Sequence, residues 1–127
     1  MNQSFGKQER LKSKILIEKL FSEGRSIKKY PLLLLYLPIK DSAEGQNQTG
    51  VSVSKRNFKR AVDRMHLKRL MREAFRKNKY LVNSNLESSY AFMFIYIGRE
   101  KLTYSQLFTR TEELLKKLVQ TEKDRLQ

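Results

Sequence analysis

The sequence has no cysteine, no tryptophan and a single histidine among its 127 residues. Without cysteine there are no disulfides and no thiolate metal sites. The one histidine, His66, has neither a cysteine nor a second histidine near it, which argues against a protein-bound metal ion. No apolar run reaches the ~18 residues that a membrane span needs, and residues 1–12 lack the apolar core of a signal peptide. We therefore expect a cytoplasmic protein.

Acidic residues are also scarce. There are 13 of them against 27 lysines and arginines, which gives a net charge of +14 and a pI near 10.1. This balance is typical of a protein that binds a polyanion, with nucleic acid as the first candidate and an acidic membrane as the second. The length and the 39% hydrophobic content predict one globular domain over residues 1–127, with an extended basic lead-in at 1–12 and a frayed end at 122–127.

Most of the excess positive charge lies in residues 55–79, which contain eleven lysines or arginines and only two acidic residues. On a helix at 100° per residue, the apolar residues from Leu67 onward share one face and the cations share the opposite face. Like charges four positions apart, such as Lys68 and Arg72, weaken the helix that carries them. A row of this kind therefore indicates that a polyanion binds this face.

Three features refine this prediction. Met65 projects from the cationic side, where core packing alone would not place a methionine. We expect His66 to lie at the surface or to face the nucleic acid. Lys55 and Arg56 lie at the end of a predicted strand, next to the start of the helix, whose N-terminus attracts phosphate through its free N–H groups.

The pattern along the whole chain predicts an α+β fold. Ser13 is expected to cap a first helix that Gly24 ends, and Thr103 with Gln106 resembles a capping box for the last helix. We expect a basic connector at 25–29, helices over 14–22, 55–79 and 103–121, strands over 31–38, 50–54 and 90–97, a polar loop at 41–48 and a polar connection at 78–89. Strand, basic helix and strand form a βαβ unit, and the architecture is one sheet with helices packed on one face and an open face or edge for the ligand.

Two groups of aromatic residues have alternative interpretations. The aromatic row in residues 90–97 would form either a base-stacking platform or core, and core is favoured because this strand has almost no polar side. Phe21 either packs in the core or lies partly open at the helix edge, where a base stacks on it. Asp41 and Glu44 lie in flexible sequence without fixed geometry, so we expect no catalytic residues.

Residues 50–76, GVSVSKRNFKRAVDRMHLKRLMREAFR, are similar to the signature of the bacterial ribonuclease P protein family, in which a Val-Ser-Lys strand end precedes a basic helix. The matching residues are Val53, Ser54, Lys55, Ala61, Val62, Arg64, Lys68, Arg69 and Arg72, together with Phe5, Lys7, Arg10, Leu11, Phe21 and Gly24 nearer the N-terminus. Two positions depart from the family: its central Asn is Met65 here, and the Arg that follows is His66.

The resemblance implies a two-layer α/β sandwich with a left-handed βαβ crossover. It also implies a role in a ribonucleoprotein enzyme that removes the 5′ leader from precursor tRNA. In that enzyme the RNA subunit holds Mg²⁺ and cuts the phosphodiester, so the protein would bind no cofactor itself. Its partners would be the ribonuclease P RNA subunit, in a 1:1 complex, and precursor tRNA, with no membrane partner.

The pattern and the resemblance together predict two sets of contacts. The predicted RNA-binding residues are Lys55, Arg56, Lys59, Arg60, Arg64, His66, Lys68, Arg69, Arg72 and Arg76. The leader would lie in a cleft between the first helix and the sheet, lined by Phe21, Ile17 and Tyr36. The main alternative is a general RNA-binding or ribosome-associated protein, which predicts no preference for precursor over mature tRNA. A DNA-binding module is disfavoured because the basic helix has no helix-turn-helix partner in this sequence. A nuclease active without an RNA subunit is disfavoured because the sequence has no paired carboxylates in rigid segments.

Overall fold

The computed structural model describes residues 9–39, 47–86 and 88–125. Its elements are α1 (Lys14–Glu23), β1 (Arg25–Lys29), β2 (Leu32–Ile39), β3 (Gln48–Val53), α2 (Ala61–Asn78), α3 (Tyr80–Asn83), β4 (Ser89–Tyr96) and α4 (Tyr104–Arg125). Three helices and three strands were predicted, and all are present, although α2 begins at Ala61 after a loop. Two elements were not predicted: the expected connector 25–29 is strand β1, and α3 lies in the polar connection. Phe5, Lys7, Asp41 and Glu44 lie outside the described residues.

The four strands form one sheet in the order β1-β2-β4-β3. β2 pairs antiparallel with β1 and with β4, whereas β3 runs parallel to β4. Parallel neighbours need a crossover connection, and α2 supplies it, so the predicted βαβ unit is confirmed. No helix within the described ranges has the length together with the apolar composition that spanning a bilayer demands.

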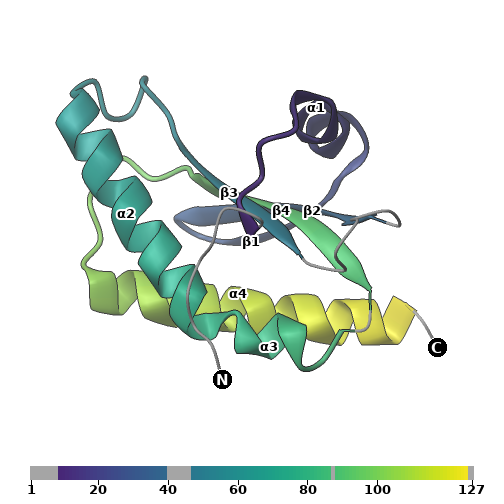
Figure 1. The fold of residues 1–127 in the computed structure, drawn as a ribbon. Helices are drawn as coiled ribbons and strands as arrows, with labels where there is room; N and C mark the ends of the chain where they lie inside the picture. The colour runs from purple at the N-terminus through teal and green to yellow at the C-terminus, as the bar shows by residue number, and fades with distance from the viewer. Residues whose placement is uncertain (1–8, 40–46, 87, 126–127) are drawn as a thin grey trace.

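Helices lie on both faces of this sheet (Figure 1): α2 and α4 cover one face, and α1 lies over the other. The aromatic side chains of β4 point toward α2 and α4 and are at most 3% exposed, so this row belongs to the core, as favoured from the sequence. They are Tyr90, Phe92, Phe94 and Tyr96. Ala91 and Met93 point the other way and pack beneath α1. The predicted sheet with helices packed on it is confirmed, and α1 adds a layer on the face expected to be open.

The predicted helix ends are confirmed. The side chain of Ser13 accepts a backbone hydrogen bond in the first turn of α1. Gly24 follows α1 at a point where a Cβ atom would lie 2.2 Å from the carbonyl oxygen of Leu20, so only glycine fits there. At the start of α4, the Thr103 amide donates to Gln106 Oε1 at 2.9 Å and the Gln106 amide donates to Thr103 Oγ1 at 3.2 Å, which completes the capping box.

The C-terminal end of α4 differs from the prediction. The helix continues through Arg125, and Glu122, expected to face water in a frayed end, is only 2% exposed. Its carboxylate accepts a hydrogen bond from the Tyr90 hydroxyl at 2.9 Å and one from Arg25 Nη1 at 3.1 Å. These partners lie on β4 and β1, far from Glu122 in the chain, so helix periodicity does not reveal them. Residues 126 and 127 lie outside the described residues.

Candidate nucleic-acid interface

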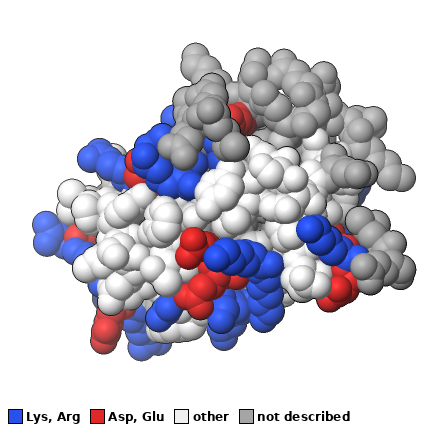
Figure 2. All heavy atoms as spheres, turned by 90° about the horizontal axis from the view of Figure 1, so that it is seen from below, with Lys and Arg blue, Asp and Glu red and all other residues white. Residues whose placement is uncertain are grey.

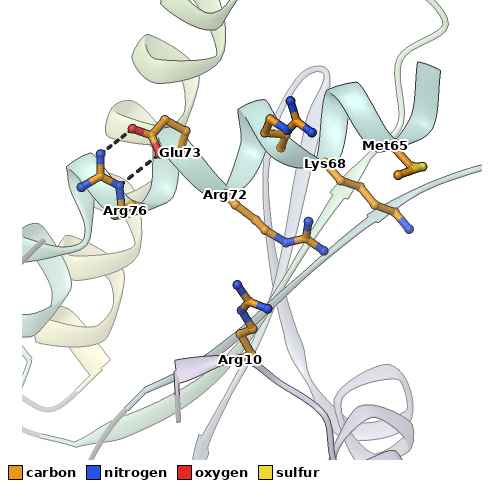
Figure 3. Close-up of a pocket in the computed structure, with 7 residues that line it drawn as sticks. Arg10, Met65, Lys68, Arg72, Glu73 and Arg76 are labelled. Atoms are coloured by element: carbon orange, nitrogen blue, oxygen red, sulfur yellow. Dashed lines mark hydrogen bonds and ion pairs between the residues drawn. The ribbon is translucent and has the colours of Figure 1, made fainter. Parts of the chain in front are cut away.

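A groove of about 530 Å³ lies between the cationic side of α2 and the N-terminal segment at Arg10 (Figure 3). Five of its seven lining side chains are basic, one is acidic and one is a methionine. They are Arg10, Met65, Lys68, Arg69, Arg72, Glu73 and Arg76. Four predicted RNA-binding residues therefore meet in one groove, and Met65, which departs from the family pattern, lies at its wall.

The amphipathic character of α2 places these cations. Its apolar face packs on the sheet and α4 and is at most 3% exposed; it carries Leu67, Met71, Ala74 and Phe75. Because side chains repeat every 3.6 residues, the residues between these positions point away from the core. Arg69 and Arg72 are accordingly exposed, and Lys68 is half-buried beside them.

The two acidic residues of α2 both pair with cations, Glu73 within the lining of the groove and Asp63 outside it. Glu73 pairs with Arg76, whose Nε lies 3.0 Å from Glu73 Oε2. This hydrogen bond lowers the pKa of Glu73 and raises the pKa of Arg76. Asp63 accepts a hydrogen bond from Lys101 Nζ at 2.6 Å, which lowers the pKa of Asp63. Neither carboxylate therefore neutralises the middle of the groove.

Lys68, Arg69 and Arg72 carry the positive charge of the groove. Within the described ranges, none of the three forms an ion pair with a carboxylate. Partial loss of hydration, and then the neighbouring charge of Arg10, lowers the pKa of Arg72. The α4 side of the molecule differs, because Figure 2 shows lysines and arginines interspersed with acidic residues there. On α4, for example, Lys116 pairs with Glu112. A groove whose basic residues outnumber its acidic residues five to one attracts anions.

The remaining predicted RNA-binding residues lie outside the groove. Arg64 has a structural contact, because its Nη1 donates to the carbonyl oxygens of Phe58 at 2.8 Å and Lys59 at 2.9 Å. This ties the loop between β3 and α2 to the first turn of the helix. The exposed members of the set, in that loop and the first turns of α2, are Lys55, Arg56, Lys59, Arg60 and His66. They extend a basic surface from the N-terminal end of α2.

The three predicted cleft residues are not brought together. Phe21 is 58% exposed on α1, and Ile17, one turn earlier, packs against the apolar residues beneath α1. Tyr36 is only 1% exposed and lies on the opposite face of the sheet, so its assignment to the cleft is wrong. Alternation along β2 explains this: Leu35 and Leu37 point toward α1, and Tyr36 between them points toward α4.

Arg10 was not among the predicted RNA-binding residues, yet it lines the groove opposite Arg72. The backbone at Arg10 forms a parallel bridge with Thr49, next to the start of β3. No local pattern could have indicated this contact, because it joins segments far apart in the chain. The available signals were the basic composition of the lead-in and the match of Arg10 to the family pattern, and neither placed Arg10 beside α2.

The described residues contain no group of three or more histidine, cysteine, aspartate or glutamate side chains able to hold a metal ion. Among the described carboxylates the deeply buried one is Glu122, and it accepts hydrogen bonds from tyrosine hydroxyls and arginines. The chemistry that this arrangement offers is electrostatic binding of a polyanion.

Comparison with known proteins identifies relatives over most of the chain. The model of the ribonuclease P family matches residues 5–119. A ribonuclease P protein component from Porphyromonas gingivalis is 41% identical over 81 residues, which are 64% of this chain and 59% of that protein. The component from Thermotoga maritima is 31% identical over 112 residues, 88% of this chain and 86% of that protein.

Solved structures share the fold. The Thermotoga maritima ribonuclease P protein superposes with a TM-score of 0.67 at 23% identity, covering 86% of this chain and 96% of that one. The Staphylococcus aureus ribonuclease P protein superposes with a TM-score of 0.65 at 20% identity, covering 87% of this chain and 94% of that one. The arrangement of sheet and helices is therefore that of these proteins.

Proposed function

Because the chain belongs to the ribonuclease P protein family, we propose that it is the protein subunit of a ribonuclease P. In this role it binds the RNA subunit and the 5′ leader of precursor tRNA and assists the removal of the leader. The RNA subunit supplies the catalysis and holds the Mg²⁺, and the protein supplies binding energy. Partners are one RNA subunit per protein and the precursor tRNA.

The observation that carries this proposal is the groove beside α2, with Lys68, Arg69 and Arg72 at its centre. Three cations held together by a folded helix bind a polyanion with little further loss of conformational freedom. Arg76 and the exposed cations that precede α2 lengthen this surface, with Arg60 at the N-terminal end of the helix, where free N–H groups attract phosphate. A continuous run of phosphates along an RNA helix fits a surface of this length better than a single small anion does.

Phe21 is the residue that we propose contacts the leader. Its ring is 58% exposed on α1, so a base of the leader can reach it and stack on it. A base stacked on such a ring contributes roughly 1–3 kcal/mol. Ile17, one turn earlier on α1, is partly buried and packs against the apolar residues beneath the helix, which helps to hold this side of α1 in place.

We expect Phe21→Ala to weaken the binding of precursor tRNA to the assembled ribonucleoprotein by roughly 1–3 kcal/mol. Binding of mature tRNA, which has no leader, should stay unchanged. Equilibrium binding of both tRNAs to the reconstituted enzyme measures this difference. Ile15→Ala is the matched control, because Ile15 is 79% exposed on the same helix and, six positions before Phe21 at about 100° per residue, lies on a different side of it. Equal losses for precursor and mature tRNA would count against a leader contact.

Reconstitution tests the proposed function as a whole. The protein is mixed with a bacterial ribonuclease P RNA at low magnesium, and 5′ processing of a precursor tRNA is followed. We expect clear stimulation over the RNA alone. Equal affinity for precursor and mature tRNA, without stimulation, would instead indicate a general RNA-binding protein.

A further inference from the structure

Residues 9–11 are held against the rest of the protein by an ion pair whose lysine is buried and whose glutamate is partly buried. Lys79, at the C-terminal end of α2, is only 5% exposed, and its Nζ lies 2.8 Å and 3.0 Å from the two carboxylate oxygens of Glu9. A buried ammonium group is costly unless a charge partner accompanies it. The burial of Lys79 is therefore coupled to the presence of Glu9 at this position.

A second contact fixes the same segment on the other side of Arg10. The Leu11 amide donates to the Thr49 carbonyl at 3.0 Å, and the Leu11 side chain is 8% exposed beneath α1. Arg10 thus lies between two anchored neighbours, Glu9 and Leu11. Its backbone is held beside β3, and its guanidinium points into the groove toward Arg72 (Figure 3).

Two guanidinium groups that face each other repel, and the neighbouring Arg10 contributes to the lowered pKa of Arg72. The contacts of Glu9 and Leu11 hold the segment in place and so keep the two guanidinium groups near each other. An anion placed between the two groups would turn the repulsion into two attractions. A phosphate is suited to this position, since arginine binds its oxygens with paired N–H groups.

We propose that Glu9 and Lys79 are positioning residues for RNA binding: their ion pair docks residues 9–11 so that Arg10 and Arg72 bind the same RNA phosphate from opposite walls of the groove. This inference rests on the proposed function. The inference adds that the binding surface has two walls, α2 with Arg72 and residues 9–11 with Arg10. The second of these is in place only while the ion pair between Glu9 and Lys79 is intact.

The test is a set of double-mutant cycles read as affinity for a ribonuclease P RNA. An arginine–phosphate contact of ordinary strength predicts that Arg10→Ala alone weakens binding about tenfold. In a Glu9→Ala background, Arg10→Ala should have no further effect, because the segment is no longer docked. Arg72→Ala should still weaken binding there. Lys116→Ala, on the mixed-charge face of α4, is the control and should leave affinity unchanged.

Lys79→Met provides an independent background that keeps the buried volume and removes the charge. Glu9→Ala raises the net charge by one and Lys79→Met lowers it by one, so general electrostatic effects have opposite signs. Both backgrounds should nevertheless abolish the contribution of Arg10. Hydrogen exchange at the Leu11 amide should accelerate in both variants, and urea unfolding should show that the remainder of the fold persists.

The outcomes separate the two claims. If Arg10→Ala weakens binding equally in the wild-type and both mutant backgrounds, the positioning role is wrong. If Arg72→Ala weakens binding and Arg10→Ala does not, the claim that Arg10 forms a second wall of the RNA-binding groove is wrong, while the proposed function stands. If neither variant changes affinity, the groove is not the RNA interface, and both the positioning role and this part of the proposed function are overturned.

Discussion

Replacing Lys68, Arg69 and Arg72 together by alanine is expected to weaken binding of ribonuclease P RNA by roughly a hundredfold to a thousandfold. Each charge-assisted contact to a phosphate contributes about 1.5 kcal/mol, and three of them sum to about 4.5 kcal/mol when they act independently, which is on the order of a thousandfold. Contacts that share a phosphate sum to less. The slope of log K against log salt concentration should fall by about two to three, since each lost phosphate contact removes 0.7 to 0.9. Titrations at several salt concentrations measure both quantities.

The matched control is the triple replacement of Arg110, Lys116 and Lys117 by alanine on α4. It removes the same net charge from a face where acids already pair with two of these cations. We expect little change in affinity or salt slope. Equal losses in the two triple variants would show that overall charge, and not the groove, binds the RNA. The groove variant should unfold no more easily than the wild type, because it removes the repulsion between Lys68 and Arg72.

The cationic wall on α2 could be predicted from the sequence because helix periodicity is a local property. Once Leu67 and Met71 define the buried face, the positions of Lys68, Arg69 and Arg72 follow from 3.6 residues per turn. The opposite wall could not be predicted in this way. Arg10 is placed by an ion pair between residues 70 positions apart, and no pattern within either segment encodes their contact.

The errors in the sheet have a similar origin. β2 is apolar on both faces, so its sequence has no polar side that shows which residues point toward α1. The pairing of β2 with β4 determines which side chains point to each face, and it directs Tyr36 into the core beneath α2 and α4. β1 has the opposite problem: only Ile27 is buried among polar neighbours, so this edge strand lacks the alternation by which strands are identified.

Glu122→Ala is expected to lower the free energy of unfolding by roughly 3 kcal/mol. The carboxylate accepts hydrogen bonds from two buried hydroxyls, Tyr90 at 2.9 Å and Tyr36 at 3.5 Å, and each hydroxyl left without a partner costs about 1–3 kcal/mol. Loss of the contact with Glu122 costs Arg25 and Arg125 less free energy, because their side chains are 36% and 49% exposed and water can hydrate them. Burial, followed by the Glu122 contact, raises the pKa of Tyr90, so its hydroxyl remains a donor at neutral pH.

Urea unfolding measures this loss, and the melting temperature should fall by on the order of 10 °C. Glu122→Gln keeps an oxygen that accepts a hydrogen bond from Tyr90, so its cost should be clearly smaller. Glu113→Ala, which breaks exposed ion pairs on the same helix, should change stability by less than about 1 kcal/mol. Because Glu122 contacts β1, β2 and β4 and not the groove, the folded Glu122→Ala protein should bind RNA as the wild type does. Wild-type stability of this variant would mean that water replaces the carboxylate, and that the last turn of α4 is not held by it.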